Sequence, residues 1–224
     1  MGLALMMVMV MGGAYATLLI VQDWKRREYQ HALGVGKWLL AGIGVYFIAL
    51  LGFSVTSSDR LVGSEGVQFC SLDGDCGTTG AIVRVERKKT AGNPPRELMA
   101  DGMFYVVTVK VSSSEANPKF RPKDLTGYVV DANGKAYGRR TQAEWELAGE
   151  TVAEPAVMYQ IVSGPSGGSY RKTMVFDLPM GVQGPALVLQ QGSWLDRMMQ
   201  LFLVGDEDSM LHGKTKLQVV VSGE

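Results

Sequence analysis

The chain has 224 residues, in which 22 Lys and Arg residues balance 22 Asp and Glu residues, and it carries only two cysteines and two histidines. A balanced charge argues against nucleic acid or another polyanion as the partner. So few Cys and His side chains leave little material for a metal site or for a nucleophile with a histidine base. We therefore expect no cofactor, no metal ion and no catalytic residues.

Two long apolar runs open the chain, residues 2–21 and residues 38–55, and neither contains a charged side chain. As helices they would reach about 27 to 30 Å, close to the ~30 Å thickness of the bilayer hydrocarbon. The sequence thus predicts a membrane anchor over residues 1–55, with two helices that contact lipid. Nothing basic precedes the first run, as a cleaved signal peptide would require. A signal, or a translation start further along the chain, stays open as an alternative for residues 1–21.

A basic connector, residues 22–37, separates the two runs. It holds Lys25, Arg26, Arg27 and Lys37, which are all four of the basic residues before residue 56. Because Lys and Arg near membrane helices favour the cytoplasmic side, we predict that the connector is cytoplasmic. Everything after residue 55 then faces away from the cytoplasm, across a bacterial inner membrane. A lipid-specific or partner-binding role for Lys25, Arg26 and Arg27 is the alternative.

Residues 56–68 are polar and are expected to form a tether to a soluble domain over residues 69–224. The two cysteines, Cys70 and Cys76, flank an Asp-Gly turn at the start of that domain. Outside the cytoplasm a disulfide between them is the simplest expectation. Free thiols or a redox role are alternatives, although the spacing is not the CxxC of thiol oxidoreductases.

The soluble region alternates apolar and polar residues with a period of two, which is typical of strands. Asp131 to Gly134 carry the Asn and Gly of a hairpin turn; a truncated calcium loop is the rarer alternative. One helix is predicted over residues 141–148, with Thr141 as its N-cap and Glu144 as the partner in a capping box. The pattern favours an all-β domain, a β-sandwich. The predicted strands are 81–86, 103–112, 125–131, 135–137, 156–163, 170–178, 187–190 and 216–221.

Gly164 to Gly168 read G-x-S-x-G, the motif around the nucleophile of α/β-hydrolases. Asp177, Asp196 and His212 follow Ser166 in the order of such a triad. The motif requires a helix directly after the serine, whereas residues 170–178 have the pattern of a strand. A membrane-bound serine hydrolase is therefore kept only as an alternative.

Residues 205–215 form a candidate binding loop, because acids, a hydroxyl group, a histidine and a lysine lie close together in it. A loop whose side chains satisfy one another and the local backbone is the alternative, and we favour it. The candidate binding residues are Asp206, Glu207, Asp208, Ser209, His212 and Lys214.

The domain resembles the immunoglobulin-like, telokin-like extracytoplasmic domains of bacterial membrane-anchored proteins and lipoproteins. The resemblance covers residues 66–222 and lies in the segments 103–112, 128–137 and 174–179, with the 205–215 loop similar to a segment in a membrane-anchored subset. It implies an immunoglobulin-like β-sandwich and a place outside the cytoplasm, and no reaction. The insertion over residues 138–155 and the missing lipobox depart from the family pattern.

Together these patterns predict a non-enzymatic, membrane-anchored binding or envelope accessory module. We expect a protein partner in the cell envelope. A sensor or assembly subunit that signals through residues 22–37 is a further alternative.

Overall fold

The computed structural model describes residues 2–63, 66–69, 77–115, 118, 120, 122–151, 159–164, 167–203, 209 and 212–221. The chain divides into two compact units. The first contains Met1–Asp59 and Trp194–Lys214, and the second contains Arg60–Ser193 and Thr215–Glu224.

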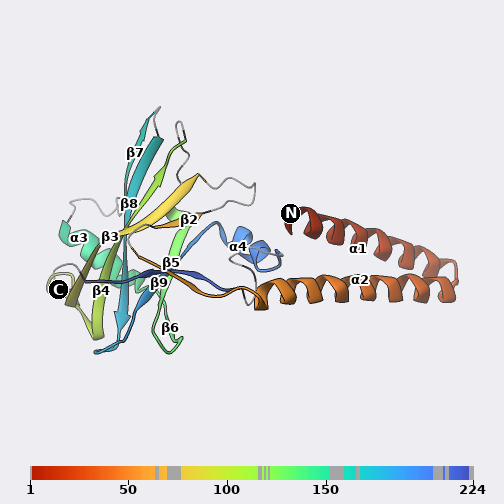
Figure 1. Ribbon diagram of the computed structural model, residues 1–224, viewed down its shortest axis with the longest axis horizontal. Helices are drawn as coiled ribbons and strands as arrows, with labels where there is room; N and C mark the ends of the chain where they lie inside the picture. Colours follow the sequence, from red (N-terminus) through yellow and green to blue (C-terminus); the bar gives the residue numbers. More distant parts are fainter. Residues whose placement is uncertain are drawn as a thin grey trace. The chain divides into compact units, whose positions relative to one another are not determined.

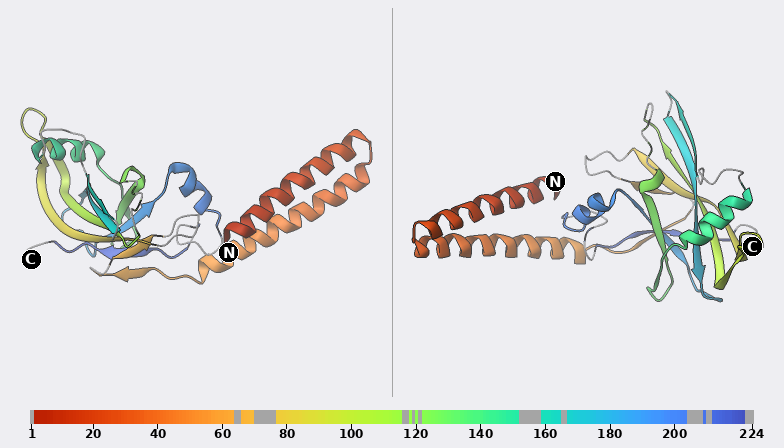
Figure 2. Two further views of the ribbon diagram at one scale, coloured as in Figure 1. Left: turned by 90° about the horizontal axis from the view of Figure 1, so that it is seen from above. Right: turned by 180° about the vertical axis from the view of Figure 1, so that it is seen from behind.

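Helices α1, Gly2–Lys25, and α2, Tyr29–Val55, form an antiparallel hairpin (Figure 2). Both are long and apolar enough to cross a membrane. The chain reverses within three residues, because Arg27 adopts a φ of 61° and the amide of Glu28 donates to the carbonyl oxygen of Asp23. This left-handed residue followed by a long backbone bond is a Schellman turn, which ends many helices. Because α1 ends at Lys25 and α2 begins at Tyr29, most of the connector 22–37 is helical. The connector can be helical because it contains no proline, and each glycine in a helix costs only about 1 kcal/mol.

A short helix far along the chain, α4, Trp194–Gln200, belongs to the same unit as the hairpin. The segment that follows it lies along α2, where the Tyr46 hydroxyl donates to the Phe202 carbonyl oxygen. On α2 the buried side chains of Tyr46, Leu50 and Ser54 are spaced by four residues, so they share one face of the helix. The sequence did not predict α4, and residues 194–214 were expected within the sandwich domain.

The second unit is a β-sandwich of two five-stranded sheets (Figure 1). The first sheet has the order β1-β10-β9-β5-β6, in which β1 and β10 are parallel and the other pairs are antiparallel. Its strands are β1, Arg60–Val62; β5, Leu125–Val130; β6, Ala136–Tyr137; β9, Ala186–Gln191; and β10, Thr215–Gln218.

The second sheet has the order β2-β3-β4-β8-β7 and is antiparallel throughout. The longest of its pairings join β3 to β4 and β4 to β8, and they align Phe104 with Asp177. Its strands are β2, Val67–Phe69; β3, Thr78–Ala91; β4, Leu98–Ser113; β7, Tyr159–Gly164; and β8, Gly167–Leu178.

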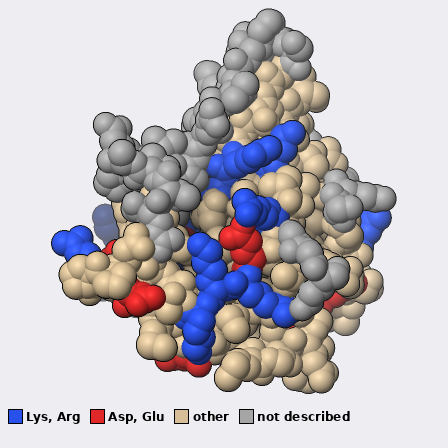
Figure 3. Space-filling model, turned by 90° about the vertical axis from the view of Figure 1, so that its left-hand side faces the viewer, with Lys and Arg blue, Asp and Glu red and all other residues tan. Residues whose placement is uncertain are grey.

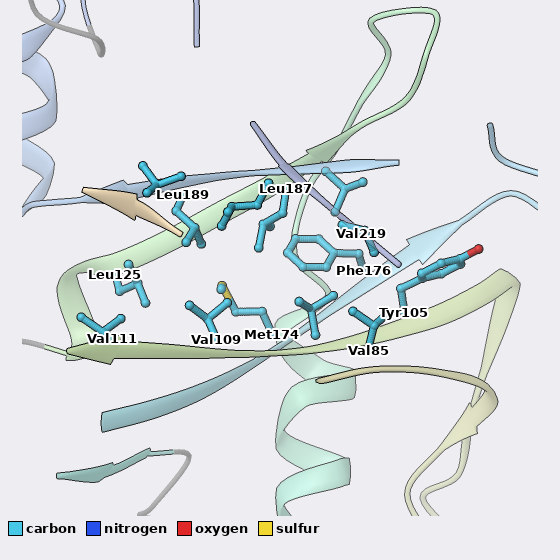
Figure 4. Packing of buried hydrophobic residues seen from close by; sticks show 14 of the residues in the cluster. Val85, Tyr105, Val109, Val111, Leu125, Met174, Phe176, Leu187, Leu189 and Val219 are labelled. Atoms are coloured by element: carbon cyan, nitrogen blue, oxygen red, sulfur yellow. The ribbon is translucent and has the colours of Figure 1, made fainter. Parts of the chain in front are cut away.

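The core lies between the two sheets (Figure 4). Alternate residues of β4 and β8, such as Val109 and Phe176, point toward Leu125 and Leu187 of the other sheet, and all four are fully buried. The period-two alternation therefore places one apolar face of each sheet inward, as the sequence predicted.

A smaller apolar cluster lies between the second sheet and α3, Thr141–Thr151. Ala143 and Leu147 of α3 pack there against Phe104, Val106 and Val175. The predicted helix is present, but the predicted capping box is not. The helix already begins at Thr141, and the Glu144 carboxylate is buried and binds Arg139 and the amide of Val175. Burial under the helix pairs this carboxylate with Arg139 and with the Val175 amide of β8, so it does not turn back to the N-terminus.

Two sequence expectations need correction. The chain is not strictly all-β, because four α-helices accompany the strands in the described residues. The tether 56–68 contains β1 and the start of β2, so it is part of the sandwich from Arg60 onward. These strands are only three residues long, too short to show a period of two in the sequence.

Candidate functional site

Two neighbouring arginines precede α3, and a buried carboxylate fixes their position. Arg139 donates from Nε to Glu144 Oε1 at 2.8 Å and makes a second, charge-assisted contact with the other carboxylate oxygen. Glu144 Oε1 also accepts from the Val175 amide at 3.1 Å. The amide of Arg140 donates to the Val175 carbonyl oxygen at 2.8 Å. The start of α3 is thus bound to β8, and Arg140 is left at the surface.

Two aspartates meet Arg140 at the end of β8. The Asp177 carboxylate accepts from the amides of Asp101 at 3.0 Å and Gly102 at 3.1 Å, so it holds the start of β4 in place. The Arg140 guanidinium lies 3.3 Å from Asp101 Oδ2 and 3.6 Å from Asp177 Oδ2. Arg140 is 57% exposed and Asp101 is 92% exposed, so solvent weakens this pairing and both groups can reorganise around a ligand.

Two open pockets adjoin this cluster, with volumes of about 410 Å³ and about 380 Å³. Both lie within the range of ligand pockets in proteins, and Asp101, Arg140 and Asp177 line both. The larger pocket is completed by Gly102, Lys135, Tyr137, Pro179 and Met180. The smaller one is completed by Leu98, Met99, Phe104, Arg139, Thr141, Gln142 and Ala143. We call the two pockets together the Arg140 site.

Exposed apolar side chains border the Arg140 site. Met99 is 73% exposed and Met180 is 75% exposed, one on each pocket. Trp145 is 54% exposed and follows Thr141 by one helical turn, so both lie on the same face of α3. Figure 3 views the side on which α3 lies and shows basic side chains gathered around a smaller number of acidic ones. The surface therefore combines charge, flexible methionines and an exposed tryptophan.

The β5–β6 hairpin supplies one wall of the larger pocket. Asp131 Oδ1 accepts from the amides of Asn133 and Lys135, each at 2.9 Å, and Oδ2 accepts from the Tyr137 hydroxyl at 3.1 Å. The bond from the Lys135 amide is the main cause that lowers the pKa of the Asp131 carboxyl. Gly134 has a φ of 80°, as the predicted turn requires. The carboxylate stabilises the turn, and Lys135 and Tyr137 of this hairpin line the larger pocket.

Lys172 is an unusual residue of the sandwich interior. It points inward from β8, is 6% exposed, and donates from Nζ to the carbonyl oxygens of Pro122 at 2.7 Å and Leu125 at 2.6 Å. Burial, followed by the nearby charge of Arg139, lowers the pKa of Lys172 to about 8. The ammonium group joins the two sheets through their backbone and does not line the Arg140 site.

The described part of the candidate loop 205–215 is bound to α2 and to its own backbone. Ser209 is 1% exposed, and its hydroxyl lies 3.5 Å from that of Ser54. His212 Nδ1 lies 2.9 Å from the Gly213 carbonyl oxygen, and the Lys214 amide donates to Asp59 at 2.8 Å. These groups act here as the attachment of the loop to the end of α2. The acids Asp206, Glu207 and Asp208 lie outside the described residues.

Of the other predicted site residues, some lie outside the described residues and some lie in the helical hairpin. Cys70 and Cys76 lie outside the described residues, as does Ser166. Strand β8 begins at Gly167, so the strand–turn–helix context of a hydrolase serine is missing. Lys25, Arg26 and Arg27 end α1 and form the hairpin turn, and Lys37 lies within α2. Over the ranges that the structure describes, no three His, Cys, Asp or Glu side chains gather as metal ligands do.

Sequence reasoning missed the Arg140 site entirely. Its three central residues, Asp101, Arg140 and Asp177, are far apart in sequence. Asp101 and Asp177 meet through the pairing of β4 with β8, and Arg140 joins them because its amide binds the Val175 carbonyl oxygen of β8. The Arg139-Arg140 pair directly before a predicted helix was the one local signal, since basic residues are unfavourable near a helix N-terminus.

Comparison with protein-family models gives no match, and neither does comparison with curated proteins. Three solved structures are similar in part. A conserved hypothetical protein from Bacillus anthracis is 16% identical, with 56% of this chain and 88% of that one covered and a TM-score of 0.37. The secreted protein MPT63 from Mycobacterium tuberculosis is 10% identical over 63% and 95% of the two chains, with a TM-score of 0.37. An uncharacterised β-sandwich protein from Clostridium difficile is 8% identical over 73% and 96%, with a TM-score of 0.35.

Proposed function

We propose that this protein is a membrane-anchored binding module in which the α1–α2 hairpin spans a bacterial inner membrane and the sandwich binds a protein partner outside the cytoplasm. The anchoring is supported by two helices whose apolar side chains face outward: Met11 is 72% exposed, Trp38 81% and Ile48 71%. Such exposure would be unfavourable in water and is favourable in lipid.

The Arg140 site carries the proposal of a protein partner. Arg, Trp and Met are the residue types that are enriched where proteins bind one another, and this surface exposes Arg140, Trp145, Met99 and Met180. Methionine side chains adapt to the shape of a partner. The Arg140 guanidinium can bind a partner carboxylate, while Asp101 and Lys135 offer one charge of each sign for polar groups beside it.

The sheet orders support the finer proposal of an immunoglobulin-like fold. In that fold, strands B, E and D share one sheet and strands G, F, C and C′ the other. The orders β4-β8-β7 and β10-β9-β5-β6 correspond to these two series. An experimental structure with a different strand order would contradict the assignment.

Photo-crosslinking in living cells tests the partner surface. We place p-benzoylphenylalanine at position 99 or 180 in the full chain and expect a covalent adduct with one protein of the envelope. Introducing Arg140→Glu should abolish that adduct, because it reverses the charge at the centre of the site. The control position is Val83, which is 45% exposed and lies outside both pockets.

Loss of the adduct in the Arg140→Glu protein, at unchanged membrane abundance, supports the binding site. An equal adduct from position 83, or an adduct that survives Arg140→Glu, would contradict it.

The orientation is tested through the two cysteines. Whole cells are treated with a membrane-impermeant thiol reagent before and after reduction. Labelling of Cys70 and Cys76 only after reduction supports a sandwich outside the cytoplasm with a disulfide between them. Labelling that requires a breached membrane and no reductant would place the sandwich in the cytoplasm and overturn the orientation.

A further inference from the structure

Helix α4 and the turn that follows it expose apolar side chains in the unit that contains the membrane hairpin. Met198 is 41% exposed, Leu201 36% and Phe202 38%. The charged residues of this segment, Asp196 and Arg197, come before the exposed ones and are partly buried. We call residues 196–203 the α4 segment.

The depth of α2 in the bilayer follows from its length and charges. Its 27 residues reach about 40 Å, whereas the hydrocarbon layer is ~30 Å thick, so one end must protrude. The amino-terminal end is the polar one: His31 lies 2.6 Å from Asp23, and Lys37 follows. With the hydrocarbon beginning at Trp38, the remaining 18 residues reach about 27 Å, and the half of α2 from Tyr46 to Val55 crosses the outer leaflet.

The α4 segment contacts this outer half of α2. The Tyr46 hydroxyl donates to the carbonyl oxygen of Phe202, and Ser209 beyond the segment reaches Ser54. Leu50, between these two positions on α2, is fully buried. Phe202, near the end of the segment, therefore lies about one side-chain length from the backbone of Tyr46. Tyr46 is about 13 Å inward from Val55 along the helix axis.

The backbone of the turn after α4 is satisfied from within. The amides of Leu201, Phe202 and Leu203 donate to the carbonyl oxygens of Arg197, Met199 and Gln200, at 3.2, 3.1 and 3.0 Å. Together with the bond from Tyr46, these contacts pair polar groups that lipid could not pair. A backbone that enters the hydrocarbon of a bilayer needs such internal hydrogen bonds, because no water is available there to replace them.

We propose that the α4 segment inserts into the outer leaflet beside α2 and that phospholipid covers Met198, Leu201 and Phe202. The exposed side chains of Phe47 and Leu51 on α2, 42% and 41% exposed, offer an apolar surface of the same kind at the same depth. The segment does not span the membrane; it is a third, interfacial contact contributed by residues far from the hairpin in sequence. The inference rests on the proposed membrane anchoring.

The test uses the full chain, reconstituted into vesicles of phosphatidylethanolamine and phosphatidylglycerol. We place p-benzoylphenylalanine singly at positions 198 and 202 and irradiate. Position 48, where Ile48 is 71% exposed on α2, is the control for anchoring, and position 180 on the sandwich is the control for chance collision. We expect the protein to gain the mass of one phospholipid from positions 48, 198 and 202, and no such gain from position 180.

Each other outcome has a distinct meaning. A phospholipid adduct at position 48 without one at 198 or 202 overturns the inserted segment and leaves the anchoring intact. No adduct at position 48 overturns both. Equal adducts at positions 180 and 198 overturn the inference as well, because labelling would then need no insertion.

Discussion

The sandwich and the helical hairpin use the same apolar residue types in opposite ways. In the sandwich, Val109 and Phe176 are fully buried against the facing sheet, whereas on the hairpin Ile48 is 71% exposed and Trp38 81%. The sandwich therefore finds its apolar environment within its own chain, and the hairpin needs one from outside. The comparison teaches that hydrophobicity alone does not decide burial; the spacing of the apolar residues does, since period two packs one face and a continuous run leaves every face apolar.

Truncating a core side chain gives the largest expected contrast between the two regions. Phe176→Ala should lower the free energy of unfolding of the sandwich by about 4 kcal/mol, because it leaves a cavity between two packed sheets. Ile48→Ala, the matched truncation on the hairpin, should change it by about 0.5 kcal/mol or less. Urea denaturation of the full chain in detergent micelles, followed by near-ultraviolet circular dichroism, measures both. Similar losses in the two variants would contradict the comparison.

The buried ion pair beneath α3 gives the second contrast: it tests whether loss of a buried charge destabilises the sandwich as much as truncation of a core side chain does. Glu144→Ala should destabilise the sandwich by about 3 kcal/mol, because Arg139 and the Val175 amide lose their partner. Replacing Arg139 by Met in the same protein should recover part of this loss. The control is Glu97→Ala at an exposed site, which should be nearly neutral in the same denaturation experiment. A neutral Glu144→Ala would show that the pair does not hold α3 in place.

Lys172 gives a smaller effect that depends on pH. Its pKa is about 8 in the folded chain and 10.5 in the unfolded one, so between these values the unfolded chain binds more protons. The free energy of unfolding should therefore rise with pH over that window, by about 2 to 3 kcal/mol from this group. Lys172→Met should lack the rise, while Lys135→Met, at an exposed lysine, should retain it. Parallel pH profiles for wild type and Lys172→Met would contradict the assignment.

The smallest expected effect on stability is at the Arg140 site. Arg140→Ala should change the free energy of unfolding by about 0.5 kcal/mol or less, because Arg140 is 57% exposed and the buried Asp177 carboxylate keeps its two amide donors. Denaturation of this variant beside Phe176→Ala would separate a binding surface from the packed core. A loss of several kcal/mol would show that Arg140 supports the fold instead.

Much of the fold could be predicted from local pattern. The central strands were found because β4 and β8 alternate over more than ten residues, and the β5–β6 turn was found because Gly134 needs a positive φ. Strands β1 and β2 were missed because their identity comes from the strands they pair with. Helix α4 was missed for the same kind of reason, since its position depends on contacts with α2, about 150 residues earlier.

Little of the candidate site could be predicted in this way. The charged loop 205–215 attracted attention because its residues are neighbours in sequence, and its described members prove to be bonded to α2 and the local backbone. Asp101, Arg140 and Asp177 became neighbours only after two strands paired and α3 was fixed by Glu144. Residues that are close in sequence can be recognised as a turn from the sequence alone, whereas residues that become neighbours across a sheet are found only from the structure.

The position of residues 194–214 in the helical unit has a consequence for how the sandwich could be separated from the hairpin. The chain passes between the two units three times, after residues 59, 193 and 214. A single proteolytic cut between Asp59 and Arg60 would sever the hairpin from the rest of the polypeptide. The carboxyl-terminal fragment would still contain residues 194–214, whose hydrogen bonds to Tyr46 and Ser54 of α2 and to Ser57 just beyond it hold the fragment to the hairpin. Separation of the sandwich from the hairpin would therefore require the breakage of these noncovalent contacts as well as a peptide bond.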